Sequence, residues 1–165
     1  MSRSYPRHIL AIDPGTEAAG WCRLEVPTPG TWSVRGMGAI LLPAGQLYRR
    51  LAHLQEKLEP IIADAKTLFC ECVVERPFVN KNFMATLAIA GARGVVLALM
   101  GRANLRFTEY SPQTWKQVIG NGRADKPEVA YKIGRILKLP STPSFDQADA
   151  AAMALYHATR PDDDA

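Results

Sequence analysis

The chain has 165 residues, 47% of them hydrophobic and 22% charged, which suits one globular core and excludes a disordered or coiled-coil chain. Three of its 16 acidic residues are consecutive, at 162–164, so residues 1–161 contain 13 acidic and 20 basic residues. This excess of positive charge favours a polyanionic partner, although an ordinary basic surface also fits. Its three cysteines, without CxxC or Cys/His spacing, exclude a disulfide scaffold and a zinc ribbon and indicate reduced thiols.

The first third of the chain predicts three antiparallel strands. Ile9–Ile12 is a short apolar run that ends in Asp13-Pro14-Gly15, which is typical of a buried strand entering a turn. Trp21–Val26 and Thr31–Leu42 are rich in strand-forming residues and are separated by the turn-forming Pro27–Gly30. The short connections favour a meander.

Helices and strands alternate after this meander. Leucine and isoleucine recur at steps of three and four through residues 47–62, which predicts an amphipathic helix. Leu68–Val74 and Arg106–Tyr110 are predicted strands, and the apolar segment Asn82–Met100 between them is a predicted long helix.

Two further helices are predicted near the C-terminus. Asp125 and Glu128 have the spacing of a capping box before a helix that ends at Lys138-Leu139-Pro140. Ser144 and Gln147 repeat the pattern before a helix that reaches about His157. The order β-β-β-α-β-α-β-α-α is typical of an RNase H-like α/β fold, a mixed five-stranded sheet flanked by helices. We expect one domain over residues 1–160 and a short acidic tail at 161–165.

Four carboxylates occupy positions at which such a fold forms a site. Asp13 ends the first strand, Glu75 ends the fourth, and Asp146 and Asp149 share a face of the last helix. Together they would repel one another unless a divalent cation neutralised them. Hard oxygen ligands without Cys or His favour Mg²⁺ or Mn²⁺ over zinc, and two such ions can cleave a phosphodiester.

Two of these carboxylates, taken alone, have a simpler interpretation. Asp13 could be a turn residue before Pro14, and Asp146 could interact with the dipole in the first turn of its helix. Glu75 follows two valines and Asp149 lies among alanines, so neither is explained as easily. Their convergence depends on the predicted fold.

The motifs, in this order, resemble the RuvC family of bacterial Holliday-junction resolvases from about Ile9 to His157. The segments that carry the likeness are Ile12–Thr16, Val74–Phe78 with Lys81-Asn82, Gly91–Gly94, Tyr110–Pro112 through Lys116-Gln117, Gly120–Lys126, Leu137–Pro140 and Asp146–Ala150. The resemblance implies that Asp13, Glu75, Asp146 and Asp149 are the metal-binding catalytic carboxylates.

The resemblance also implies contacts with DNA. Lys116 and Lys126 match lysines near the scissile phosphates, and Phe78 matches an aromatic that stacks on a base near the junction centre. Lys126 at a helix N-terminus independently suits a phosphate, although a solvated helix-end charge is the simpler interpretation, as core packing is for Phe78. Further expected DNA contacts are Arg76, Lys81 and Arg123.

The chain departs from the family pattern at Pro77 and at Trp115, which replaces a small aliphatic residue. Four aromatic residues could provide base-stacking surface or pack in the core: Tyr110, Trp115, Tyr131 and Phe145. These departures affect the preferred junction sequence rather than the chemistry.

We therefore expect a homodimeric endonuclease that nicks two opposing strands of a four-way DNA junction. It would bind two Mg²⁺ per subunit, with Mn²⁺ as a substitute, and a branch-migration helicase is a candidate partner. The apolar helix Asn82–Met100 is expected to pack partly on a second copy, the alternative being the core helix of a monomer.

Two other functions stay open. One is a nuclease of relaxed specificity on the same fold, acting on forks or flaps. The other is an actin-like or sugar-kinase-like nucleotide-binding protein, because Asp-Pro-Gly after a strand can face a phosphate, but the Asp146/Asp149 pair would then have no use. Neither a signal peptide nor a membrane span is predicted, since the longest uncharged apolar run is Gly94–Gly101, so we expect a cytoplasmic protein with no membrane partner.

Overall fold

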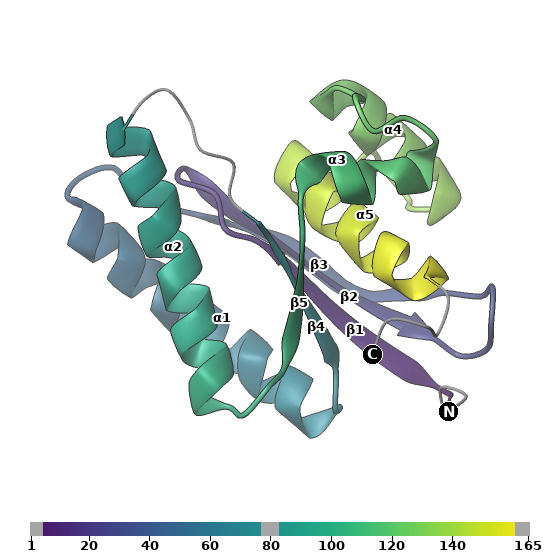
Figure 1. The fold of residues 1–165 in the computed structure, drawn as a ribbon, viewed down its shortest axis with the longest axis horizontal. Coiled ribbons are helices and arrows are strands. Elements are labelled where there is room, and N and C mark those ends of the chain that lie inside the picture. The colour runs from purple at the N-terminus through teal and green to yellow at the C-terminus, as the bar shows by residue number, and fades with distance from the viewer. Residues whose placement is uncertain (1–4, 77–82, 161–165) are drawn as a thin grey trace.

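The computed structural model describes residues 5–76 and 83–160, which form a five-stranded sheet with helices on both faces (Figure 1). The elements are β1 (Arg7–Asp13), β2 (Ala18–Val26), β3 (Ser33–Leu41), α1 (Leu47–Thr67), β4 (Glu71–Glu75), α2 (Phe83–Arg102), β5 (Phe107–Tyr110), α3 (Pro112–Trp115), the 3-10 helix η1 (Lys116–Ile119), α4 (Lys126–Ile136) and α5 (Phe145–Thr159).

The sheet has the strand order β3-β2-β1-β4-β5. Antiparallel pairing joins β1 to β2 and β2 to β3, which confirms the predicted meander. The two remaining strands run parallel to β1, with β4 beside β1 and β5 beside β4. The mixed sheet places the carboxyl ends of β1, β4 and β5 at one edge.

Each face of the sheet is covered by its own layer of helices. Figure 1 shows α1 and α2 on one side and α3, α4 and α5 on the other. Side chains alternate along β1, so Ile9 and Ala11 face the α5 layer while Leu10 and Ile12 face α1 and α2. Both faces are therefore buried, as a strand at the centre of an α/β sheet requires.

The observed elements differ from the predicted ones mainly at their ends and in one connection. Residues 112–119 form α3 and η1, which the sequence analysis did not predict. The Ser144–Gln147 capping box is complete. The predicted box at Asp125 and Glu128 forms only in part: the Asp125 side chain accepts from the Glu128 amide, but the Glu128 side chain does not return to Asp125. It contacts Asn121 and Lys132 instead. All three cysteines are free and buried, in agreement with reduced thiols.

Helix α2 is long and apolar enough, by length and composition, to cross a membrane, which the short uncharged run did not indicate. Two observations fit a helix of a globular domain instead. Arg93 in its middle forms an ion pair with Glu109 of β5 at 2.7 Å. The side of α2 that carries Ala92, Val96 and Leu99 is buried in the core it shares with α1.

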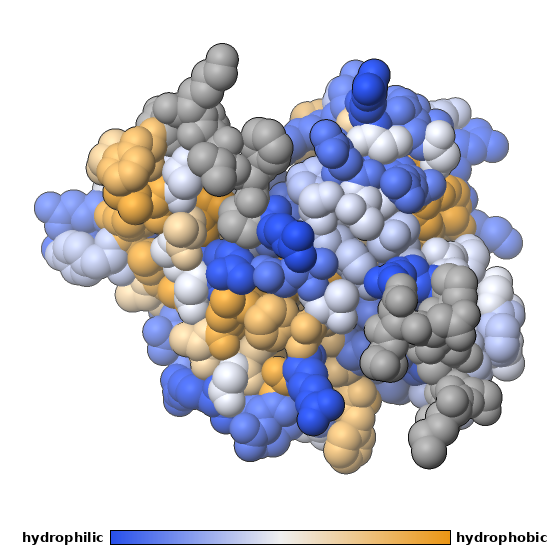
Figure 2. All heavy atoms as spheres, in the orientation of Figure 1, coloured by the Kyte–Doolittle hydropathy of each residue, from blue (hydrophilic) through white to orange (hydrophobic). Residues whose placement is uncertain are grey.

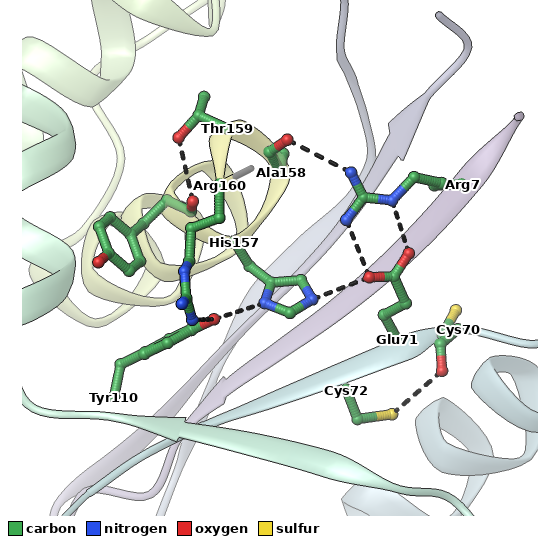
Figure 3. Close-up of polar contacts among 10 residues, drawn as sticks. Arg7, Cys70, Glu71, Cys72, Tyr110, His157, Ala158, Thr159 and Arg160 are labelled. Carbon is green, nitrogen blue, oxygen red and sulfur yellow. Dashed lines mark hydrogen bonds and ion pairs between the residues drawn. The ribbon is translucent and has the colours of Figure 1, made fainter. Parts of the chain in front are cut away.

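A chain of polar contacts joins the C-terminal end of α5 to the start of the sheet (Figure 3). Arg7 donates two hydrogen bonds to the Glu71 carboxylate, at 2.6 and 2.8 Å. His157 of α5 lies between Glu71, 2.9 Å from Nε2, and the Tyr110 hydroxyl, 2.8 Å from Nδ1. Arg160 donates to the same hydroxyl at 2.9 Å. Three strands and α5 are thus connected by charged and polar groups.

Glu71 is expected to stabilise the fold in its ionised form. Burial acts to raise its pKa, but hydrogen bonds from Arg7 and His157 outweigh burial and hold the pKa of Glu71 at about 2. Because this value lies below the unfolded one, the stabilisation is present above about pH 4.5 and is lost as pH falls towards 2.

We predict that Glu71→Gln lowers the free energy of unfolding at pH 7 by about 2 kcal/mol, because the Arg7 guanidinium keeps only a neutral acceptor. The difference should shrink between pH 4.5 and 2, which urea titrations at several pH values would measure. Glu56→Gln, at an exposed pair with Lys57, is the control and should change stability by less than about 0.5 kcal/mol. Equal effects of the two substitutions would contradict the prediction.

Candidate active site

Parallel pairing of β1 and β4 brings the first two predicted carboxylates together. Ile12 is paired with Val74, so Asp13 and Glu75 are the next residues of adjacent strands. Alternation puts both on the α5 side of the sheet, the side that Ala11 also faces. Two acids from segments more than 60 positions apart in sequence therefore stand next to each other at one edge.

The other two carboxylates come from the first turns of α5. Ser144 caps this helix, and Asp146 and Asp149 follow on one face, three residues apart. The helix approaches β2 very closely at Gly20, which is paired with Asp13: a Cβ at position 20 would overlap the carbonyl oxygen of Asp146. Only glycine lets the beginning of α5 lie this close to the end of β1.

Two lysines border the same site. Lys116, the first residue of η1, donates from Nζ to the Ala124 carbonyl at 2.7 Å and lies 5.5 Å from the centroid of the Trp115 ring. Lys126 is exposed and begins α4, directly after the capping residue Asp125. The positive charges of both lysines act to lower the pKa values of Glu75 and Asp149.

Trp115 is the site residue whose role the sequence analysis missed. Core packing and base stacking were the interpretations considered, and the side chain is indeed buried, with 1% exposed. Its indole Nε1–H also donates a hydrogen bond to Oε2 of Glu75 at 2.9 Å. The signal that could have found it is general: a buried tryptophan needs an acceptor for its N–H.

A cleft of about 970 Å³ collects these groups, with all four carboxylates, both lysines and Trp115 in its lining. The half-exposed Phe145 also lines the cleft, where base stacking was one of its two interpretations. The exposed Glu17 lines it too and was not predicted as a site residue. Of the expected DNA contacts, Arg76 and Arg123 are exposed beyond this lining, whereas Phe78 and Lys81 fall outside the described residues. Tyr131 is exposed on α4, beside a separate pocket, and Tyr110 is buried.

Residues 9–157 match the family model described as crossover junction endodeoxyribonuclease RuvC. The chain belongs to the RuvC family. RuvC of Bradyrhizobium diazoefficiens is 35% identical over 162 residues, covering 93% of this chain and 87% of that protein. RuvC of Halorhodospira halophila is 36% identical over 151 residues, covering 91% and 89%. Family membership confirms the resemblance and disfavours the actin-like interpretation.

Solved structures confirm the RNase H-like fold prediction. Thermus thermophilus RuvC superposes with a TM-score of 0.77 at 25% identity, covering 92% of this chain and 93% of that one. The same protein in complex with a Holliday junction substrate gives 0.80 at 24% identity, covering 93% of each chain. The yeast mitochondrial Holliday junction resolvase Ydc2 gives 0.60 at 15% identity, covering 96% and 82%.

Burial raises the pKa values of three carboxylates in this RuvC-family cleft, those of Asp13, Glu75 and Asp149. It raises the pKa of Asp13 well above its usual range, and the charges of Glu75, Asp149 and Asp146 add to the effect. Burial also raises the pKa of Glu75 to about 7, against the opposing hydrogen bond from Trp115, and the pKa of Asp149 to about 6. A bound cation would remove this penalty, since it favours the ionised forms.

The donor set fits a hard divalent metal. Oδ1 of Asp149 is buried and has no hydrogen-bond partner within the described part of the chain. A buried carboxylate oxygen without a partner is costly unless it binds a cation. As placed, no three Asp, Glu, His or Cys side chains in residues 5–76 and 83–160 are grouped closely enough to hold one ion. The like charges of the four side chains oppose a closer grouping as long as no cation is bound.

We predict that Gly20→Ala displaces the beginning of α5, because the new methyl group has no room beside the Asp146 backbone. It should lower the free energy of unfolding by about 1–3 kcal/mol and reduce the rise in Tm caused by Mg²⁺, since Asp146 moves away from Asp13. Thermal unfolding with and without Mg²⁺ measures both. Gly134→Ala in α4, where the added methyl makes an ordinary contact with Pro143, is the control and should be close to neutral. A full Mg²⁺ effect in Gly20→Ala would contradict the proposed spacing.

Proposed function

We propose that this RuvC-family protein is a homodimeric, metal-dependent endonuclease that resolves four-way DNA junctions by nicking two opposing strands. The observation that carries the proposal is the convergence of Asp13, Glu75, Asp146 and Asp149 in one cleft beside two lysines. Five of the 13 acids in residues 1–161 line this cleft, in a chain with an excess of basic residues. A nuclease needs both features, because basic residues attract DNA and acidic residues bind the metal.

The four carboxylates are proposed to hold two Mg²⁺ ions per subunit, with Mn²⁺ as a substitute. Asp13, which lies between the ends of β4 and α5, would bridge the two positions, and the other three acids would complete them. When bound, such a pair supplies a water-derived nucleophile and neutralises charge at the phosphate. In-line attack would leave a 5′-phosphate and a 3′-hydroxyl.

The lysines have separate proposed roles at the phosphate. Lys116 is held by its bond to the Ala124 carbonyl, so its ammonium keeps a defined position for charge stabilisation. Lys126 is exposed at the N-terminus of α4, where the positive end of the helix dipole adds to its charge. Arg76 and Arg123 are proposed backbone contacts, and the roles of Phe78 and Lys81 stay predictions.

Helix α2 is the proposed dimer surface. An exposed stripe at steps of three and four runs along it, formed by Phe83, Leu87, Ala90, Gly94, Ala98 and Gly101. Figure 2 shows apolar residues gathered over the beginning of α2. A Cβ at Gly94 or Gly101 would contact nothing within 4 Å, so a second helix could approach closely there. Two copies would present two clefts to the two equivalent strands of a junction.

The cytoplasm is the proposed place of action, because the proposed substrate is the cell's own branched DNA. A branch-migration helicase is a candidate partner, since it would move a junction to a sequence that the enzyme cuts.

We predict that Asp13→Asn, Glu75→Gln, Asp146→Asn and Asp149→Asn each slow junction cleavage by more than about 100-fold, because metal affinity falls. Junction binding should persist or tighten, since each change removes a negative charge that faces DNA. Single-turnover cleavage of a labelled junction in Mg²⁺ and in EDTA, beside gel-shift binding, measures both.

The control for these variants is Glu17→Gln, which removes an exposed acid from the same cleft but not a proposed ligand. It should cut at close to the wild-type rate. Cleavage at the wild-type rate by any of the four variants would exclude that residue as a ligand. Equal wild-type rates on junction, fork and duplex DNA would favour the relaxed-specificity nuclease.

We predict that the wild-type protein sediments near twice 18.1 kDa at micromolar concentration and that Leu87→Glu sediments as a monomer. Leu87 is 45% exposed, so the charge disturbs the stripe more than the core. Tyr131→Glu, at an exposed aromatic residue of α4, is the control and should stay dimeric. A wild-type monomer, with or without DNA, that still makes paired cuts would rule out the dimer.

A further inference from the structure

Trp115 lies where α3 meets both the sheet and the cleft. The Ser111 side chain caps α3, accepting from the Thr114 amide, and the Trp115 amide donates to the Ser111 carbonyl. This short helix turns the indole into the core formed with α5, where it is 1% exposed. Packing restricts both of its side-chain torsions, so its N–H points in one direction.

The indole N–H of Trp115 points to Glu75, a proposed metal ligand. Nε1 donates to Oε2 of Glu75 at 2.9 Å, and Glu75 lines the cleft with Asp13 and Asp149. The donor occupies one carboxylate oxygen and leaves the other for the cleft. A carboxylate with one oxygen held in this way has lost much of its rotational freedom before a ligand arrives.

We propose that Trp115 is a positioning residue that orients the Glu75 carboxylate for the divalent metal. This inference rests on the proposed role of Glu75 as a ligand and deepens it. With 1% of its side chain exposed, Trp115 would act on the metal through the Glu75 side chain that it holds.

The same ring also contacts the phosphate side of the site. The ammonium of Lys116 lies 5.5 Å from the indole centroid, within the range of a cation–π interaction. One buried side chain thus touches a metal ligand with its edge and a proposed phosphate-binding lysine with its face. A small aliphatic residue at this position could make neither contact.

A purely structural tryptophan is the competing explanation, since a buried indole commonly finds some acceptor. The two explanations differ in what they predict for metal binding. A structural role predicts lower stability with unchanged metal affinity, whereas a positioning role predicts weaker metal binding even in a folded variant.

The first experiment compares Mn²⁺ binding, without DNA, in the full-length wild type, Trp115→Phe, Glu75→Ala and the double variant. Trp115→Phe removes the N–H and keeps an aromatic ring, and it should weaken Mn²⁺ binding by about 10-fold, measured from free Mn²⁺ by EPR. In the Glu75→Ala background the same substitution should have no further effect, because its only route to the metal is gone.

Trp32→Phe is the matched control. Trp32 packs against the same core but does not line the cleft, so this variant should bind Mn²⁺ like the wild type. Wild-type affinity in Trp115→Phe, or an undiminished effect in the Glu75→Ala background, overturns the inference.

A second measurement uses the wild-type protein and stands even if Trp115→Phe does not fold. The protein has three tryptophans, so three indole N–H signals are expected in a ¹H–¹⁵N spectrum. Titration with Mg²⁺ should shift the Trp115 signal in step with the rise in Tm, and leave that of Trp32 in place. An unmoved Trp115 signal at saturating Mg²⁺ overturns the inference.

Failure of the inference is distinct from failure of the proposed function. If the wild type cuts junctions and Trp115→Phe binds Mn²⁺ normally, the inference alone is wrong. If Trp115→Phe weakens Mn²⁺ binding but the wild type cuts no branched DNA, the inference stands and the proposed activity is wrong. If the wild type binds no Mn²⁺, both are wrong.

Discussion

The parallel pairing of β1 with β4 is the constraint on which the rest of the molecule depends. It aligns the ends of two buried strands, and the alternation of side chains then sends Asp13 and Glu75 to the same face. Any register other than Ile12 opposite Val74 would separate the two acids or turn one of them towards α1 and α2. A slip by one position would move every side chain of one strand to the opposite face, so the packing against both layers of helices opposes it.

Helix α5 is fixed against this sheet at both of its ends, by different means. Its beginning is capped by Ser144 and lies against the backbone of β2, and its end is tied through His157 to Glu71 and Arg7. Between these points the helix presents alanines to the sheet, which allows close packing. The two aspartates therefore stand on a rigid body, as a site that concentrates like charges requires.

Much of this could be predicted from the sequence, for reasons that are local. The strands, the long helices and the Ser144 cap follow from periodicity and capping chemistry. The four acids stand out because they lie at the ends of two predicted strands and on one face of the last predicted helix. Residues 112–119 were missed because two four-residue helical turns are too short to show a period. The Trp115–Glu75 contact joins positions 40 apart through the tertiary fold, and the contact of Gly20 with α5 depends on two backbones meeting, which no side-chain pattern encodes.

Gly20 shapes the cleft because it has no Cβ atom. It has no group that binds, reacts or donates, so a search for the machinery of the cleft among polar side chains passes over it. Yet the absence of a methyl group at this position of β2 allows the first turn of α5 to lie close to the end of β1. The cleft is therefore sensitive to substitution at a position that has no functional group, and a redesign that altered only the ligands would leave the spacing of β2 and α5 unchanged.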